Sequence, residues 1–220
     1  MMETTVTFNQ FIQSLVDTMY MIGVSLLIGA LIGIPLGILL VVTRPGGIVE
    51  NKVFFAILNP IINIVRSLPF IILLVAIVPF TRFIVHTSIG TAAAIVPLII
   101  YIAPYIARLV ENSILEVDDG IIEAAKSMGA TPLQTIRYFM LPEAFGSLIL
   151  SMTTAMIGLL GATAMAGAVG GGGVGDLAIS YGYQRFDSFI MIVTVIVLII
   201  FVQIIQSIGN WLAAKARRES

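Results

Sequence analysis

Five long apolar segments dominate this chain of 220 residues. A helix needs about 20 mostly apolar residues to cross a hydrocarbon core of about 30 Å. Lipid offers no partners to backbone polar groups, so a spanning segment must satisfy them within itself, as a helix does. The sequence therefore predicts an all-α polytopic membrane protein with five transmembrane helices, at about residues 19–42, 54–80, 89–110, 148–168 and 189–212.

The composition excludes several other classes of protein. Hydrophobic residues make up 59% of the chain and charged residues 10%, whereas about a quarter of the residues of soluble domains are charged. The formal net charge of -1 argues against the basic patches that bind nucleic acid. The absence of cysteine excludes disulfides and thiolate metal sites, and a single histidine, His86, makes a histidine-based metal site unexpected.

The start of the chain and the breaks between segments are also informative. Residues before the first apolar run include Glu3 and Asp17 but no lysine or arginine, so a cleavable signal peptide is not expected. The sequence RPGG at 44–47 should end the first span, because proline lacks a backbone donor and paired glycines favour turns. Pro79 and Arg82 are expected to end the second span, and a glycine-rich run at 167–175 separates the last two.

The distribution of lysine and arginine predicts the orientation. Five spans place the termini on opposite sides, and loops rich in these residues face the cytoplasm. With the C-terminus in the cytoplasm, only Arg82 and Arg185 lie outside. The N-terminus is therefore expected outside and the polar segment 111–145, between spans three and four, in the cytoplasm. The basic residues assigned to the cytoplasmic side are Arg44, Lys52, Arg108, Lys126, Arg137, Lys215, Arg217 and Arg218.

Small residues recur four apart in the first span, at Ser25, Gly29, Gly33 and Gly37. Such a stripe lets helix backbones approach closely in lipid. We interpret it as a helix-packing face, with a role in a pore as the alternative.

The polar insert reads as two short helices joined by a glycine turn. Acceptors and turn geometry at 118–120 favour a helix at 121–128, and Gly129 is a natural stop because it takes positive φ without a Cβ penalty. Thr131 then has the sequence of an N-cap, with Pro132 first in the next helix and Gln134 completing a capping box. We expect this second helix to end before Pro142.

Glu123-Ala124-Ala125, Gly129 and Leu141-Pro142 stand at fixed spacing in the insert. This pattern resembles the signature of the membrane permease subunits of ATP-binding-cassette (ABC) importers, except that Phe139 stands where that family usually has isoleucine. The resemblance implies that 121–128 is a coupling helix seated in a groove of a separate cytoplasmic ATPase. It implies that this chain is not an enzyme and binds no cofactor, since ATP and Mg²⁺ are used by the partner ATPase. The residues that carry the resemblance, and would couple to the ATPase, are Glu123, Ala124, Ala125, Gly129 and, after Leu141, Pro142.

Most of the chain also resembles the methionine-uptake permeases of bacteria, through stretches at 42–46, 66–74, 79–82, 87–90, 128–132, 167–170 and 181–183. The resemblance implies one permease domain over 1–220 that forms a path for methionine by alternating access in the bacterial cytoplasmic (inner or plasma) membrane. The implied partners are a second copy, two cytoplasmic ABC ATPase subunits and an extracytoplasmic substrate-binding lipoprotein, with no nucleic acid.

Two other functions remain open from the residues alone. A permease for another small amino acid or organic solute fits equally, because no residue pattern in the chain selects methionine over other small apolar amino acids. An ion-coupled secondary transporter would call for Asp or Glu within a span, whereas Asp17, Glu111 and Asp187 fall at predicted ends.

Two residues are candidates for a gate or substrate path. Arg66 falls deep in the second predicted span, where a charge needs protein or water around it, and the following Ser-Leu-Pro suggests a broken helix. The alternative is that the helix begins late and Arg66 lies near the cytoplasmic interface. Met165, a flexible side chain among small residues, could plug a narrow path, or could be an ordinary filler in lipid.

The glycine-rich run at 170–173 is expected to be an external loop or hinge. Tyr181, Tyr183 and Arg185 follow it and could contact the delivery protein, although tyrosines also gather at membrane interfaces.

Overall fold

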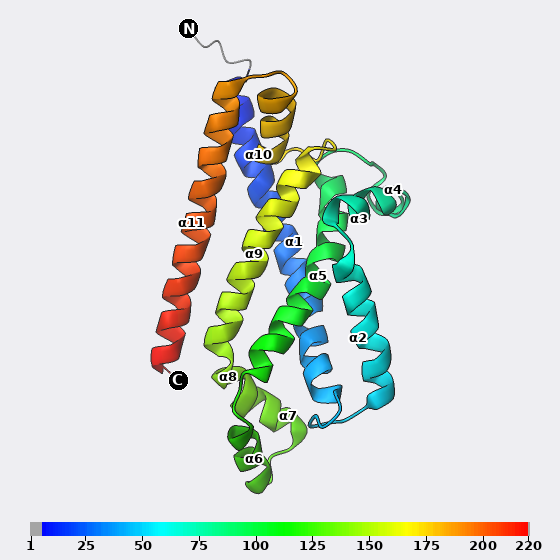
Figure 1. Ribbon diagram of the computed structural model, residues 1–220, viewed down its shortest axis with the longest axis vertical. Coiled ribbons are helices and arrows are strands. Elements are labelled where there is room, and N and C mark those ends of the chain that lie inside the picture. The colour runs from blue at the N-terminus through cyan, green and yellow to red at the C-terminus, as the bar shows by residue number, and fades with distance from the viewer. Residues whose placement is uncertain (1–5, 220) are drawn as a thin grey trace.

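The computed structural model describes residues 6–219, and every regular element in that range is a helix. Glu3 and the side chain of Arg218, used above for the N-terminus and the orientation, lie outside the described residues. Four helices in the described range are long and apolar enough to cross a membrane, and a bent pair raises this to five. They are α1 (Phe8–Thr43), α5 (Thr91–Leu115), α9 (Phe145–Gly167) and α11 (Ser188–Glu219), which form an elongated bundle with α2 (Lys52–Ser67) (Figure 1).

The predicted second span, 54–80, is not one helix. It is divided into α2, α3 (Phe70–Ala76) and α4 (Val78–Val85), with a bend of 100° between α2 and α3. Pro69 explains the break, because it lacks an N–H and forces Leu68 into an extended conformation. The expectation that Pro79 and Arg82 end this span is wrong: Pro79 lies in the first turn of α4, where a missing N–H costs nothing.

The first span ends as expected, since α1 stops at Thr43. The following loop folds back on the helix, where Val49 and Asn51 donate N–H hydrogen bonds to the carbonyls of Val42 and Thr43 at 2.9 and 3.0 Å. These bonds occupy carbonyls at the helix end that have no helical partner.

The small-residue stripe of α1 packs against α5, in agreement with the packing interpretation. Gly33 lies so close to α5 that an added Cβ would come within 2.5 Å of the Ala103 carbonyl oxygen, and Gly37 stands in the same relation to Ala107. Ser25 on the same stripe is fully buried. Dispersion contacts at this short separation hold helices together where lipid supplies no hydrophobic driving force.

The insert between α5 and α9 consists of α6 (Asp119–Ser127), α7 (Pro132–Gln134), the π-helix η1 (Thr135–Met140) and α8 (Leu141–Glu143). The expectation that its second helix ends before Pro142 is wrong, because helical backbone continues through Pro142 toward α9. The wider turn of η1, in which the Leu141 N–H bonds to the Ile136 carbonyl five residues back, accommodates a residue that cannot donate.

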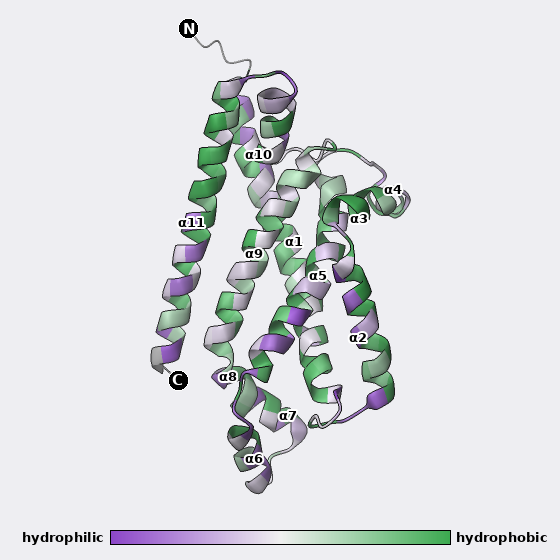
Figure 2. Ribbon diagram, viewed as in Figure 1, coloured by the Kyte–Doolittle hydropathy of each residue, from purple (hydrophilic) through white to green (hydrophobic). Residues whose placement is uncertain are grey.

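The opposite end of the bundle carries α10 (Gly173–Asp176) and a second π-helix, η2 (Leu177–Tyr183), which the sequence alone did not predict. Residues 168–172 form the expected turn, with positive φ at Gly170 and Gly172. This end is tied to α1, because the Val174 N–H donates to the Thr18 hydroxyl at 2.9 Å. Figure 2 shows that the upper half of α11 is hydrophobic, whereas its lower half, α2 and the lower half of α5 carry hydrophilic residues.

Substituting valine for Gly33 should destabilise the bundle by about 2 kcal/mol or more, since overpacking at a helix contact forces the backbones apart. Gly23→Val is the matched control, because a Cβ at Gly23 in the same helix meets nothing within 4 Å. Thermal unfolding of the purified protein in detergent measures the difference. Equal midpoints for the two variants would contradict the packing role of the stripe.

Candidate functional site

The helix α6 stands out at one end of the bundle and is capped at both of its own ends. At its start the Asp118 carboxylate accepts a hydrogen bond from the Gly120 N–H at 2.7 Å. At its end Gly129 has φ +76°, and the N–H groups of Gly129 and Ala130 donate to the carbonyls of Lys126 and Ala125, both at 3.0 Å. This Schellman pattern fixes where the short helix stops.

The second half of the insert is fixed by the capping box predicted from the sequence. The Gln134 side-chain oxygen accepts from the Thr131 N–H at 2.8 Å, and the Thr131 hydroxyl accepts from the Gln134 N–H at 3.4 Å. With Pro132 in the first helical position, the direction of α7 is set immediately after the glycine turn. The two halves of the insert are therefore held in a defined relation.

The five predicted coupling residues lie in two environments. Glu123, Ala124, Gly129 and Pro142 are exposed, whereas Ala125 is fully buried within the chain itself. Only the four exposed residues are therefore accessible to a partner. Ala125 lets α6 lie close against the rest of the insert.

Sequence reasoning missed two residues that flank the glycine turn. Met128 is 67% exposed and Leu133 is 72% exposed, so a large apolar side chain is exposed on each side of the glycine turn. Exposed apolar side chains on an otherwise polar element mark a surface that another molecule covers. Their position beside a predicted turn in a polar insert could have identified them as exposed apolar residues.

A cavity of about 390 Å³ separates α6 from the loop that follows α1. Glu123 and Lys126 line it from α6, and Arg44 lines it from the loop. The loop itself is held by Glu50, whose carboxylate accepts from the Gly46 N–H at 2.9 Å and pairs with Lys52 at 3.2 Å. The Gly46 hydrogen bond, and then Lys52, lower the pKa of Glu50 below its ordinary value.

The insert is connected to the spans by apolar packing and one short hydrogen bond. Ile121 and Ile122 of α6 pack against the main hydrophobic core, to which Met140 belongs. The Ser147 hydroxyl at the start of α9 donates to the Glu116 carboxylate after α5 at 2.6 Å. This bond joins the end of α5 to the start of α9 at the base of the insert.

A partly buried polar network joins α2 to α5. Arg108 pairs with Glu111 at 2.5 Å, and its other terminal nitrogen donates to the side-chain oxygens of Asn59 and Asn63 at 2.7 Å each. Glu111 lies about one turn before the end of α5 at Leu115 and is only 6% exposed. Asp17 likewise lies within α1. Glu111 is engaged by Arg108, so it does not form the unpaired acidic group that an ion relay would use.

A set of aromatic rings lies between Arg66 and Met165. Arg66 is in the last turn of α2, with its guanidinium carbon 5.8 Å from the centre of the Tyr105 ring. The broken helix suggested by the sequence is present, and the alternative of a late helix start is wrong because α2 begins at Lys52. Met165 is 51% exposed and lines a cavity of about 270 Å³ with Phe70 and Tyr101.

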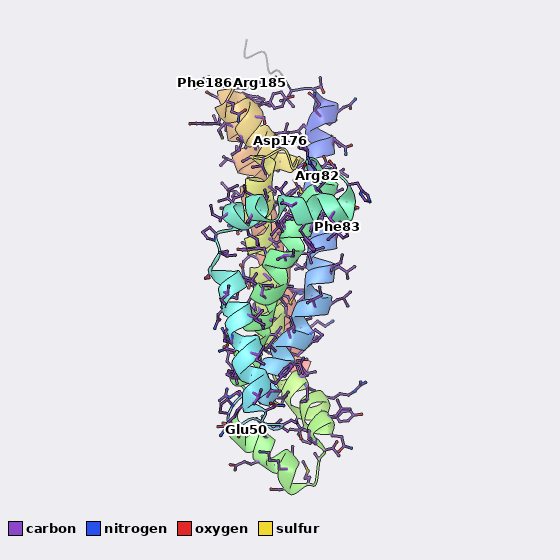
Figure 3. All side chains as sticks on the ribbon, turned by 90° about the vertical axis from the view of Figure 1, so that its right-hand side faces the viewer. Glu50, Arg82, Phe83, Asp176, Arg185 and Phe186 are labelled. Atoms are coloured by element: carbon purple, nitrogen blue, oxygen red, sulfur yellow. The ribbon has the colours of Figure 1, made fainter. Side chains whose placement is uncertain are left out.

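The predicted partner-contact residues lie at the far end from the insert, where Figure 3 labels Arg185 and Phe186. The Arg185 guanidinium carbon lies 4.3 Å from the centre of the Tyr181 ring, and Tyr183 is 69% exposed. Phe186, not singled out from the sequence, is 86% exposed and has φ +57°. Arg185 stacked on Tyr181, together with the exposed Tyr183 and Phe186, forms the outer surface at this end.

Comparison with known proteins identifies the relatives of this arrangement. Residues 33–218 match the family model described as "Binding-protein-dependent transport system inner membrane component". The chain is 52% identical over 199 residues to the Vibrio cholerae protein named "Probable D-methionine transport system permease protein MetI", covering 90% of this chain and 88% of that protein. It is 52% identical over 151 residues to "D-methionine transport system permease protein MetI" of Escherichia coli K12, covering 69% of this chain and 70% of that protein.

Solved structures show the same fold. A chain of the inward-facing MetNI methionine ABC transporter, in its native CY5 crystal form, matches with a TM-score of 0.93 and 44% identity over 96% of this chain and 99% of its own length. A chain of an amino acid ABC transporter with histidines matches with a TM-score of 0.77 at 20% identity, over 96% of this chain and 100% of that chain. The second likeness bears on the fold alone.

Glu111→Ala should destabilise the protein by about 3 kcal/mol, because it leaves the buried charge of Arg108 without its counterion. The double variant Arg108→Met with Glu111→Leu should recover at least half of that loss, since it removes both charges together. Thermal unfolding of the three proteins in detergent measures both effects. If the double variant is as unstable as Glu111→Ala, the pair does not owe its effect to charge compensation.

Proposed function

We infer the function from family membership: the chain belongs to the binding-protein-dependent transport system inner membrane components, whose model matches residues 33–218. It is the membrane-spanning permease subunit of an ATP-driven ABC importer for methionine, in the bacterial cytoplasmic (inner) membrane, where it spans the bilayer several times. The observation that carries this conclusion is the match to the MetNI methionine transporter, at 44% identity over 96% of this chain and 99% of the other. The relatives do not favour the alternative of another small amino acid or organic solute as cargo.

The permease works with several partners. It pairs with a second copy of itself, and ATP is hydrolysed in two separate ATPase subunits on the cytoplasmic side, so the permease is not itself an enzyme. An extracytoplasmic substrate-binding lipoprotein delivers methionine. We propose that ATP and Mg²⁺ bind only to the ATPases and that residues 1–220 form one permease domain.

The proposed orientation places the N-terminus outside and the C-terminus in the cytoplasm. Its support is the division of charge along the bundle: Arg82 and Arg185 lie toward one end, and Glu50, with Lys52 beside it, toward the other (Figure 3). The end that carries α6 and the end of α11 holds most of the basic residues, which matches the positive-inside preference. On this orientation α6 faces the ATPases and residues 181–186 face the delivery protein.

We propose that α6 is the coupling helix within a coupling loop at about 111–145. Its caps at Asp118 and Gly129 make it a stiff element, and its exposed side, with Glu123 and Ala124, offers the docking face. Met128 and Leu133 are the apolar anchors of that contact, since a few buried apolar groups supply most of the binding energy at an interface. The connection through Ile122 and Ser147 carries the ATPase motion into α5 and α9.

Leu133→Ser should reduce the amount of ATPase that copurifies with the permease about tenfold, as expected when one apolar anchor of an interface is lost. Ile89→Ser is the control, because Ile89 is 69% exposed against 72% for Leu133 but lies at the opposite end of the molecule. Affinity purification of the coexpressed subunits measures the ratio. Equal recovery of ATPase with both variants would contradict the docking role.

Transport itself tests the function directly. Vesicles reconstituted with the permease, its ATPase and its delivery protein should accumulate methionine only when ATP is supplied to the ATPase side. Ionophores that collapse ion gradients should leave this uptake unchanged, because hydrolysis and not an ion gradient drives it. Uptake that persists without ATP and stops with ionophores would overturn the assignment.

A further inference from the structure

A cavity beside Met165 lies between α3, α5 and α9. Its walls are the start of α3 with Phe70, the α5 residue Tyr101, and α9 with Gly158, Gly161 and Met165. The sharp bend after Arg66 turns α3 away from α2 and opens one side. Its volume of about 270 Å³ compares with about 30 Å³ for one water molecule in the liquid. The space is enough for the side chain of a small apolar amino acid.

The glycines of α9 that line this cavity differ from the packed glycines of α1. A Cβ added at Gly161 meets nothing within 4 Å, and one at Gly158 meets only the Tyr105 ring, at 3.9 Å. At Gly33 of α1, by contrast, an added Cβ would overlap α5. Gly158 and Gly161 therefore do not bring helices together. Their missing side chains keep the cavity open.

One exposed cation, Arg66, approaches the cavity through the tyrosines of α5 without itself lining it. Arg66 makes no hydrogen bond or ion pair within the part of the chain that the structure describes, and its one contact of note is the Tyr105 ring. Tyr105 stacks on Tyr101 at 6.3 Å, and Tyr101 lines the cavity. Arg108, one helix turn further along α5, instead bonds through its two terminal nitrogens to Glu111, Asn59 and Asn63, while its buried Nε has no partner in the described chain. Of these two arginines, Arg66 is the one whose donors are free for an anion.

We propose that Arg66 and this cavity form a transit subsite for the transported amino acid within the permease. The Arg66 guanidinium binds the substrate carboxylate, and the cavity receives the apolar side chain against Phe70, Tyr101 and Met165. Sulfur packs favourably against aromatic rings, so a thioether suits this lining. The proposal rests on the importer function proposed above and adds that this chain recognises the substrate directly.

The chain contains no cysteine, so one thiol can be placed in the cavity and its labelling read on this subunit by mass. The variant Met165→Cys, assembled with the ATPase in nanodiscs without nucleotide or delivery protein, is treated with a maleimide. Saturating methionine should slow its labelling about tenfold, as for a site occupied about 90% of the time. Methioninol, which has an alcohol in place of the carboxylate, should not protect the thiol.

Adding Arg66→Gln to the same variant should abolish protection by methionine, because the charge that holds the carboxylate is lost. Ile89→Cys, at a position 69% exposed in the loop before α5 and outside the cavity, is the labelling control and should be indifferent to methionine. If Met165→Cys fails to assemble, Ile71→Cys reports from another wall of the same cavity.

The outcomes separate this proposal from the importer function. If wild-type complex transports methionine with ATP but methionine protects neither thiol in the cavity, the subsite is wrong and the importer assignment stands. Equal protection by methioninol, or protection that survives Arg66→Gln, overturns the role of Arg66. A thiol that is unreactive with and without methionine means that a second copy fills the cavity, which also overturns the proposal.

Discussion

The close approach of α1 to α5 is the contact on which the rest of the bundle depends. Gly33 and Gly37 let α1 lie directly on the α5 backbone. This close contact matters because the hydrophobic effect does not drive helices together in lipid. Once α5 is held on that side, it offers its other faces to α2, α3, α4 and α9. The paired Arg108, the stacked tyrosines and the Ser113 to Ser151 hydrogen bond of 2.7 Å all lie on those faces. The polar features of the spans are thus arranged around one helix.

Pro69 and Pro142 have opposite effects on the helices around them: the first breaks a helix, and helical backbone continues through the second. Pro69 ends α2, and the chain turns by 100°, which leaves Arg66 at a helix end beside an open cavity. Pro142 is carried through the helix by the preceding π-turn, so the insert runs on into α9 with only a short break at Ala144. The break at Pro69 provides space, which a substrate path requires. The continuous helix at Pro142 provides a stiff connection, which a coupling element requires.

Most of the local structure follows from residues that are close together in the chain. The stop at Thr43, the capping box at Thr131 and the glycine turn at Gly129 were predictable because each depends on residues within one turn of chain. The family signature in the insert was legible for the same reason. The helical course through Pro142 was not, since a π-turn depends on how the helix is held by its neighbours.

Contacts between residues far apart in the chain depend on how the helices pack. Whether Arg66 or Arg108 would be paired could not be predicted, because the partners Asn59 and Asn63 reach Arg108 across 49 and 45 residues of chain. A paired arginine is a fixed tie between helices, whereas an uncompensated one in a membrane segment invites an anion. The same holds for glycines: those of α1 close a helix contact, whereas Gly161 of α9 faces open space. Residue type sets what a side chain can do, and the opposing helix determines which of those possibilities is realised.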